Sequence, residues 1–116
     1  MRLLLYILSI ILSFSLYTCQ WSNTYPPAMI QAERYMNLHP DSALHLLESM
    51  ADTLTTLPEK TQMYYHLLTI QAKDKQYIIH TSDSLIKHIV DFYEKSDNDE
   101  HLMIAYYYQG KVSIEI

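Results

Sequence analysis

Hydrophobic residues recur at helical spacing along most of the chain after residue 27. The clearest run is Ala43, Leu47, Met50 and Leu54, which stand at i, i+4, i+7 and i+11. That period places all four on one face of a helix, and we expect this face to be buried in a core. Five segments carry such a stripe, and none has the pattern of a strand. The pattern therefore predicts an all-α protein built from stacked antiparallel helical hairpins.

Capping and helix-breaking residues set the expected ends of the five helices. Pro27 opens the first, which ends near Asn37, because proline loses no hydrogen bond in the first helical turn. Asp41 is the expected N-cap of a second helix that runs to about Leu54. The third helix is expected from a capping box at Thr56 and Glu59 to about Lys75, and a further turn through Ile79 stays open. The fourth is expected from Ser82 or Asp83 to about Lys95. The fifth is expected to begin in the loop Asp97 to Glu100 and to end near Ile114.

Two short sequence patterns each recur after the same number of residues. Asp83-Ser84-Leu85-Ile86 follows Asp41-Ser42-Ala43-Leu44 by 42 positions, and Tyr106-Tyr107 follows Tyr64-Tyr65 by the same interval. We therefore expect the hairpin from about Pro58 to Lys95 to be one complete repeat with half a repeat on each side. If A denotes the first helix of a hairpin and B the second, the five helices have the order A, B, A, B, A, and the last helix has no B partner. We expect either a longer array of which this chain is the amino-terminal piece, or another copy or a partner that covers this end.

An apolar segment precedes the helical pattern. Leu3 to Leu16 follows the single charge of Arg2 and is short for a membrane span of ~20 residues, but has the length of a secretory signal. Leu16-Tyr17-Thr18-Cys19 resembles a bacterial lipoprotein signal, in which the cysteine receives lipid. We expect a signal peptide over residues 1–18, lipidation of Cys19 and a linker over residues 19–26.

Two alternatives for this segment stay open: an uncleaved anchor from Leu3 to Trp21, and an ordinary signal with an incidental thiol. Each of the three interpretations places the rest of the chain outside the cytoplasm, because positive Arg2 stays inside.

Composition supports stacked helices and excludes several classes of function. The chain has one glycine and four prolines against 49% hydrophobic residues, whereas a β domain of this length needs many turn glycines. The net charge of −5 and the lack of a basic cluster argue against nucleic-acid binding. The single cysteine excludes an intramolecular disulfide and a thiolate zinc site.

The repeat resembles tetratricopeptide-type helical hairpins. In that family an aromatic residue lies four positions before a small residue on the first helix, and an alanine opens the second. Here these are Tyr106 before Gly110, within Ala105-Tyr106-Tyr107-Tyr108-Gln109-Gly110, and Ala43 in Asp41-Ser42-Ala43-Leu44. The resemblance implies that Gly110 lets a neighbouring helix approach closely. Alternatively, Gly110 is a loop residue that ends a shorter helix.

The chain departs from that family at several places. The family unit is about 34 residues long, whereas the offset here is 42. Leu68 and Leu85 also stand at the middle-repeat places of Gly110 and Ala43.

The whole chain is similar to a narrower group, the exported envelope tetratricopeptide-repeat proteins of Bacteroides-type bacteria. The lipoprotein-like signal, Gln71-Ala72-Lys73-Asp74-Lys75 and Ser82-Asp83-Ser84-Leu85-Ile86 carry this resemblance. It implies a membrane-anchored protein of the cell envelope, facing the periplasm or the exterior, that binds a protein or peptide partner without catalysis. Many members continue into a membrane helix and a cytoplasmic DNA-binding domain. The alternative is therefore that this chain is the truncated extracytoplasmic sensor portion of a membrane-spanning transcriptional regulator.

Residues with catalytic or metal-binding chemistry do not form a motif. The six histidines include no pair three or four positions apart, and Asp97-Asn98-Asp99-Glu100 lacks the glycine turn and distal glutamate of a calcium loop. There is no Gly-x-Ser-x-Gly, and one glycine cannot build a phosphate-binding loop. We expect no metal, no cofactor and no enzymatic activity. A small secreted enzyme would need convergent polar side chains in a pocket.

Tyrosine is the most frequent aromatic residue, with eleven copies. Most stand at helical spacing beside leucines, so we expect packing between helices. Tyr64 and Tyr106 are the expected core residues. Tyr65, Tyr107 and Tyr108 are the expected partner-facing surface.

Overall fold

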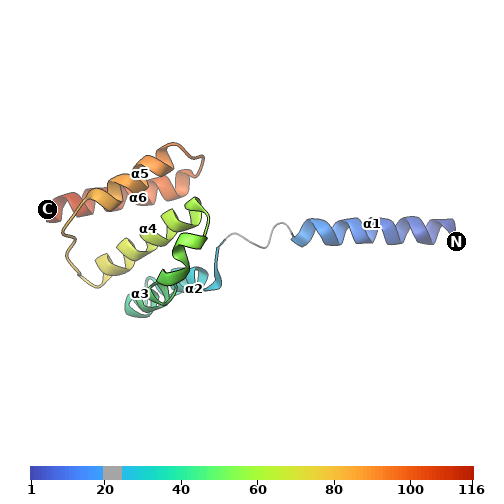
Figure 1. Cartoon of the computed structure of the whole chain (residues 1–116), viewed down its shortest axis with the longest axis horizontal. Helices are drawn as coiled ribbons and strands as arrows, with labels where there is room; N and C mark the ends of the chain where they lie inside the picture. The colour runs from blue at the N-terminus through green and yellow to red at the C-terminus, as the bar shows by residue number, and fades with distance from the viewer. Residues whose placement is uncertain (20–24) are drawn as a thin grey trace.

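A computed structural model describes the backbone of residues 1–19 and 25–116 and the side chains of residues 1–11 and 25–116. All regular secondary structure in these residues is helical, which confirms the predicted all-α class (Figure 1). The elements are α1 (Arg2–Cys19), α2 (Pro27–Tyr35), α3 (Pro40–Ser49), the 3-10 helix η1 (Ala51–Thr56), α4 (Glu59–Lys75), α5 (Ser84–Glu94) and α6 (Asp99–Glu115).

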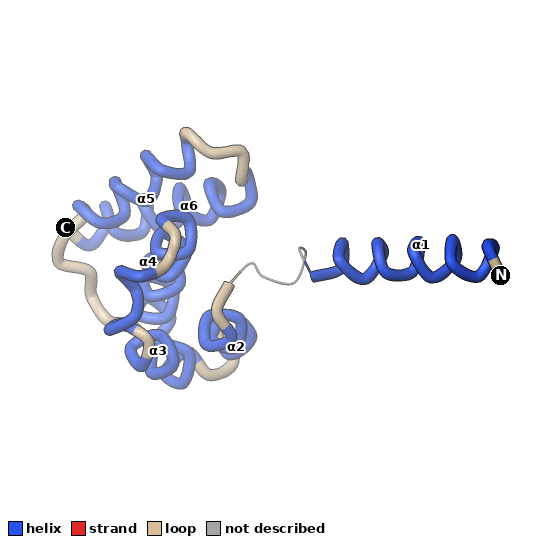
Figure 2. Tube along the Cα trace, turned by 45° about the vertical axis from the view of Figure 1, so that its right-hand side comes forward, coloured by secondary structure: helices blue, strands red, loops and turns tan. Residues whose placement is uncertain are grey.

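Helices α2 to α6 pack into one body around α4. Helix α2 packs on α3 and α5 packs on α6, while α4 contacts all four of these helices. Figure 2 shows α4 between the α2–α3 pair and the α5–α6 pair. Because both sides of α4 meet other helices, its buried residues lie on two faces. They are Thr61, Met63, Tyr64, Tyr65, Leu67, Leu68, Ile70 and Ala72.

Helix α1 lies apart from this body in Figure 1. It covers the apolar segment and ends at Cys19, whose side chain falls outside the described residues. Most of the predicted linker, and the far end of the alternative anchor at Trp21, lie in the undescribed residues 20–24. Within the described part of the chain, no helix combines the length and hydrophobicity that a membrane crossing requires.

The predicted limits of the second helix are wrong at both ends. His39 is its N-cap, because Pro40 takes the first helical position, and Asp41 lies inside the first turn. Helix α3 ends at Ser49 rather than near Leu54, and η1 follows it. In η1 the Thr53 and Thr56 hydroxyls donate to carbonyls three residues earlier, at 2.9 Å and 2.6 Å. Hydroxyls that bond nearby carbonyls compete with regular helical geometry.

The predicted capping box before α4 does not form. The Thr56 hydroxyl donates to the carbonyl of Thr53 and is therefore turned away from the amides of α4. The residue before the helix is Pro58, and no side chain caps this end. Instead, Gln62 donates from Nε2 to the carbonyl of Leu57 at 2.8 Å.

The optional extra turn at the end of α4 does not form either. Tyr77 has a φ of 60°, in the left-handed region. Its amide donates to the carbonyl of Asp74, and the amide of Ile78 donates to the carbonyl of Lys73, both at 3.0 Å. This pair of bonds closes a helix C-terminus when the next residue is left-handed. The chain therefore leaves α4 abruptly and exposes the tyrosine ring.

Helix α6 is capped by Asn98, whose Oδ1 accepts from the amide of His101 at 3.0 Å. Two predictions about this helix are wrong: Tyr106 is exposed, and a Cβ on Gly110 would meet nothing within 4 Å. Gly110 is inside the helix, so it is neither a point of close packing within this chain nor a loop residue. The buried face of α6 consists of His101, Ala105, Tyr108 and Val112.

The cause of both errors is the assumed register of the repeat. Helices α4 and α6 each have 17 residues and begin at Glu59 and Asp99, which are 40 positions apart rather than 42. At 3.6 residues per turn, a slip of two residues rotates a face by roughly 200°. With the offset of 40, four buried positions of α4 match the four of α6: Thr61, Tyr65, Leu68 and Ala72 correspond to His101, Ala105, Tyr108 and Val112.

The core contains an aromatic cluster where α2, α4, α5 and α6 meet. The rings of Tyr64 and His101 stack at 4.1 Å, nearly parallel. Tyr25 lies 4.8 Å from Tyr64, and Tyr93 meets His101 edge-on at 5.4 Å. Burial, followed by the charge of Glu33, raises the pKa of Tyr64. These contacts confirm the prediction that Tyr64 is a core residue.

Candidate functional site

The candidate site is a groove formed by α4, α6 and the connection from α2 to α3, which we call the A-helix groove. It comprises two adjoining hollows of about 400 Å³ and 280 Å³ that share Asn37, Lys75, Tyr107 and Tyr108. Asn37 follows α2, Lys75 ends α4, and the two tyrosines lie on α6. The residues that line only one hollow are Gln71, Met103 and Ile104 in the first, and Pro40, Asp74, Tyr77 and Lys111 in the second.

The floor and wall of the A-helix groove are aromatic. Tyr108 is only 7% exposed and closes the floor, and burial raises the pKa of its hydroxyl. Tyr107 is 60% exposed and stands beside it, with the two rings edge-to-face at 5.0 Å. The Lys111 ammonium lies 5.7 Å from the centre of the Tyr107 ring, close enough for a cation–π contact. The groove thus offers aromatic and thioether surface to an apolar side chain.

Among the described residues, one cation of the groove has no ion-pair partner. Asp74 Oδ2 accepts from Lys111 Nζ at 2.6 Å, and this hydrogen bond raises the pKa of Lys111. The two charges neutralise each other. Lys75 is exposed and makes no ion pair with another described residue. With the amide groups of Asn37 and Gln71 nearby, the groove can hold a carboxylate or another polar group of a ligand.

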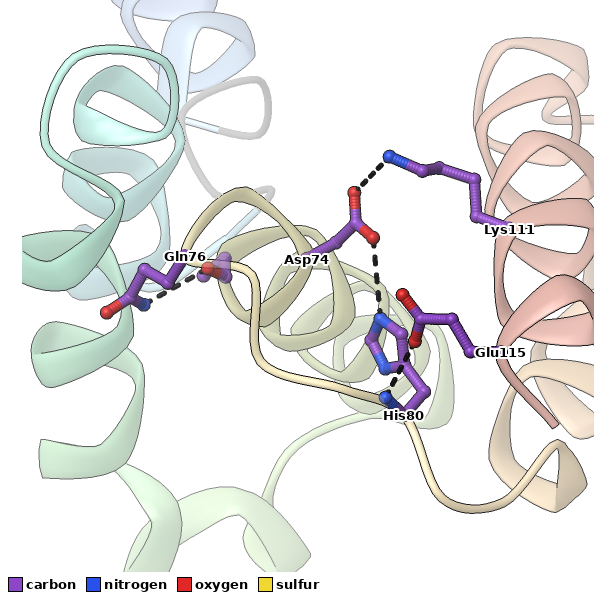
Figure 3. A network of polar contacts seen from close by, with 6 residues as sticks. Asp74, Gln76, His80, Lys111 and Glu115 are labelled. Carbon is purple, nitrogen blue, oxygen red and sulfur yellow. Dashed lines mark hydrogen bonds and ion pairs between the residues drawn. The ribbon is translucent and has the colours of Figure 1, made fainter.

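A polar network fixes the end of the groove (Figure 3). It begins at Asp74, whose Oδ1 lies 3.7 Å from Nε2 of His80, while its Oδ2 holds Lys111. The backbone amide of His80 donates to Glu115 Oε2 at 2.7 Å, so the segment after α4 is bonded to α6. Gln76 donates from Nε2 to the carbonyl of Pro40 at 3.3 Å, which joins α4 to α3. These bonds hold α3, α4 and α6 in fixed relation where they border the groove.

The three predicted partner-facing tyrosines do not lie together. Tyr107 is exposed in the A-helix groove and Tyr108 forms its floor. Tyr65 is buried on α4, where the charge of Glu48 on α3 reaches it, and it lines neither hollow. The surface role predicted for Tyr65 and Tyr108 is therefore corrected to a packing role. The lipid-acceptor prediction at Cys19 falls outside the described side chains.

The sequence pattern alone did not identify the polar residues of the groove. Asn37 lies in the turn after α2, Gln71 and Lys75 lie in the last turns of α4, and no motif joins them. The available signal was that Gln71 and Lys75 lie on α4, the repeat counterpart of α6, which carries Tyr107. Using it requires the register of α4 against α6, which the offset of 42 misplaced.

Among the described residues, no group of three or more histidine, cysteine, aspartate or glutamate side chains is placed to hold a metal ion. No protein-family model, curated protein or solved structure matches this chain.

Proposed function

We propose that this protein is a non-catalytic, membrane-anchored helical-repeat module that binds a protein or peptide partner outside the cytoplasm. The observation that carries the proposal is the A-helix groove, an open hollow bordered by α4, α6 and the connection from α2 to α3. Its hydrogen-bonded border, the exposed Tyr107 ring and Lys75, which makes no ion pair with another described residue, suit an extended peptide with an acidic group.

The packing order supports a repeat architecture of tetratricopeptide type. Helices α2 and α3 form a hairpin, α5 follows α4, and α4 also contacts α2 and α6 on either side. Tandem helical hairpins that stack in this way present one row of helices along a common surface. The A-helix groove lies on that row.

The proposed location rests on the amino-terminal segment. Arg2, the apolar run and Cys19 have the order of a lipoprotein signal. A lipid on Cys19 would leave the helical body beside the membrane with its groove open to partners.

Peptide selection against the full chain tests the proposed ligand class. We expect a displayed peptide library to yield binders enriched in aspartate or glutamate beside an apolar residue. Lys75→Glu is expected to weaken them about tenfold or more, because it replaces the free cation by a repelling anion. Tyr107→Ala should weaken them to a similar degree, since exposed aromatic anchors dominate binding energy.

Lys60→Glu is the matched control, because Lys60 is an exposed lysine near the opposite end of α4 and lines neither hollow. Binding to this variant should equal binding to the parent. Peptides that bind Lys75→Glu as tightly as the parent would show that the groove is not the site. A library that yields no binder would count against the peptide-binding function itself.

A further inference from the structure

Helix α6 has a second apolar face, turned away from the core. Met103, Tyr106, Tyr107, Gly110 and Ile114 follow one another at i, i+3, i+4, i+7 and i+11 and are all exposed. We call them the outer face of α6. The face itself contains no charged residue, and Met103 and Ile114 are 73% and 86% exposed. Two charges border it: the Tyr106 hydroxyl donates to Glu94 Oε1 at 2.8 Å, and the Lys111 ammonium lies 5.7 Å from the centre of the Tyr107 ring. A continuous exposed apolar surface of this kind marks an interaction site more often than isolated apolar residues do.

Three of the five corresponding positions of α4 are covered. At the offset of 40 residues, Met103, Tyr107 and Gly110 correspond to Met63, Leu67 and Ile70, all buried. Helix α5 packs on this side of α4: Ile70 lines one hollow together with Leu85 and Ile86 of α5. Three of the five positions of this surface are thus buried in α4 and exposed in α6, while the counterparts of Tyr106 and Ile114 are the half-buried His66 and Asp74.

We propose that the outer face of α6 is a docking surface for an amphipathic helix with the chemistry of α5. Helix α5 buries the stripe Ile86, Ile89, Val90 and Tyr93 at i, i+3, i+4 and i+7. The apolar side chains of the outer face suit such an apolar stripe on a partner helix. The 11 residues of α5 extend about 16 Å at 1.5 Å per residue, which matches the outer face.

Gly110 leaves a gap in the outer face where a partner helix can approach closely. It lies at the centre of the outer face, and the space where a Cβ would stand is open. Helices approach most closely where a side chain is missing, so an incoming helix can cross α6 at this point, between Tyr106 and Ile114. A large side chain at residue 110 would fill the crossing point.

The test attaches the proposed occupant to the protein. A second copy of residues 76–97, which contains the connection and α5, is appended after Ile116 of the full chain. We expect the appended helix to dock and raise Tm by roughly 5 °C or more, because it buries a new apolar interface. Thermal unfolding followed by circular dichroism in a mild detergent measures this shift. An extension of scrambled sequence should give no rise.

Gly110→Glu in the extended chain should abolish the rise. In the unextended chain the same change should leave Tm equal or slightly higher, because glutamate has the better helix propensity. His45→Glu, an exposed position on α3, is the matched control and should keep the rise. The proposal is overturned if the copy gives no more stabilisation than the scrambled extension, or if the rise survives Gly110→Glu. Dimerisation of the unextended chain that Gly110→Glu abolishes would overturn it in favour of a second copy as the occupant. None of these measurements depends on peptide binding in the A-helix groove.

Discussion

At the residue scale, His101 places an ionisable ring inside a cluster otherwise formed by tyrosines. Its Nδ1 lies 3.0 Å from Nδ2 of Asn98, and one ring face is covered by Tyr64. Burial lowers the pKa of His101 below its ordinary value, while the charges of Glu100 and Glu33 act in the opposite direction. The folded protein therefore favours the neutral ring.

This environment makes stability depend on pH. The ordinary pKa of 6.5 describes His101 in the unfolded chain, which takes up a proton before the folded protein does. The free energy of unfolding should therefore decline as pH falls below about 6.5, until the folded-state pKa is passed. His66 contributes with the same sign, because burial and then the nearby charge of His88 lower its pKa. Urea unfolding between about pH 5 and pH 7.5 measures the decline.

His101→Phe is the informative variant. Phenylalanine keeps a ring against Tyr64 but cannot be protonated, so the pH dependence should become flatter while the contribution of His66 persists. An unchanged slope in His101→Phe would show that His101 does not cause the effect.

At the scale of elements, periodicity predicted the helices well and their ends poorly. The stripe of Ala43, Leu47 and Met50 is buried in the structure because a period of 3.6 fixes a face regardless of where the helix stops. The ends depend on turn chemistry that several residues could supply. Thr56 is a residue type that commonly caps a helix, but its hydroxyl donates to the carbonyl of Thr53 instead. A left-handed tyrosine at residue 77 was not predictable, because glycine or asparagine ordinarily fills that place.

The site was predictable only in part, for a related reason. Tyr107 is one of three tyrosines predicted to face a partner, and it is exposed in the structure. Its grouping with Lys75 and Asn37 depends on three helices in register, and an error of two residues turns α6 to its opposite side.

Leu47→Ala tests the assigned face of α3. Leu47 is 0% exposed, so its truncation should lower the free energy of unfolding by about 2–5 kcal/mol. Denaturant unfolding measures this loss. Leu38→Ala is the control, since Leu38 is 82% exposed and its truncation should change stability by less than about 0.5 kcal/mol. Equal effects in the two variants would contradict the packing of α3 on α2 and α4.

At the scale of the whole molecule, the chain divides into an amino-terminal helix and a body built on α4. The body contains the A-helix groove and the outer face of α6, which adjoin at Met103 and Tyr107. A partner in the groove and a helix on the outer face would therefore share the edge formed by these two side chains. The proposed anchorage concerns the other end of the chain.

Cys19→Ser tests that anchorage. If Cys19 carries the lipid, the variant should move from the membrane fraction to the soluble fraction while the helical body stays folded. Fractionation of cells that express the full chain, with immunoblotting, measures the distribution. Retention of Cys19→Ser in membranes would contradict lipid anchorage and favour the uncleaved segment from Leu3 to Trp21.

The position of Tyr25 has a mechanical consequence. It is the first described residue after residues 20–24, and its ring already packs on Tyr64 of α4 and near His101 of α6. A force that pulls on the amino-terminal side of the body therefore acts first on the Tyr25 ring, which packs in the aromatic cluster. It reaches the first turn of α2 only after that. Tension between a tethered end and a partner held elsewhere on the body would load the middle of the molecule, where α4 shares the force with its neighbours.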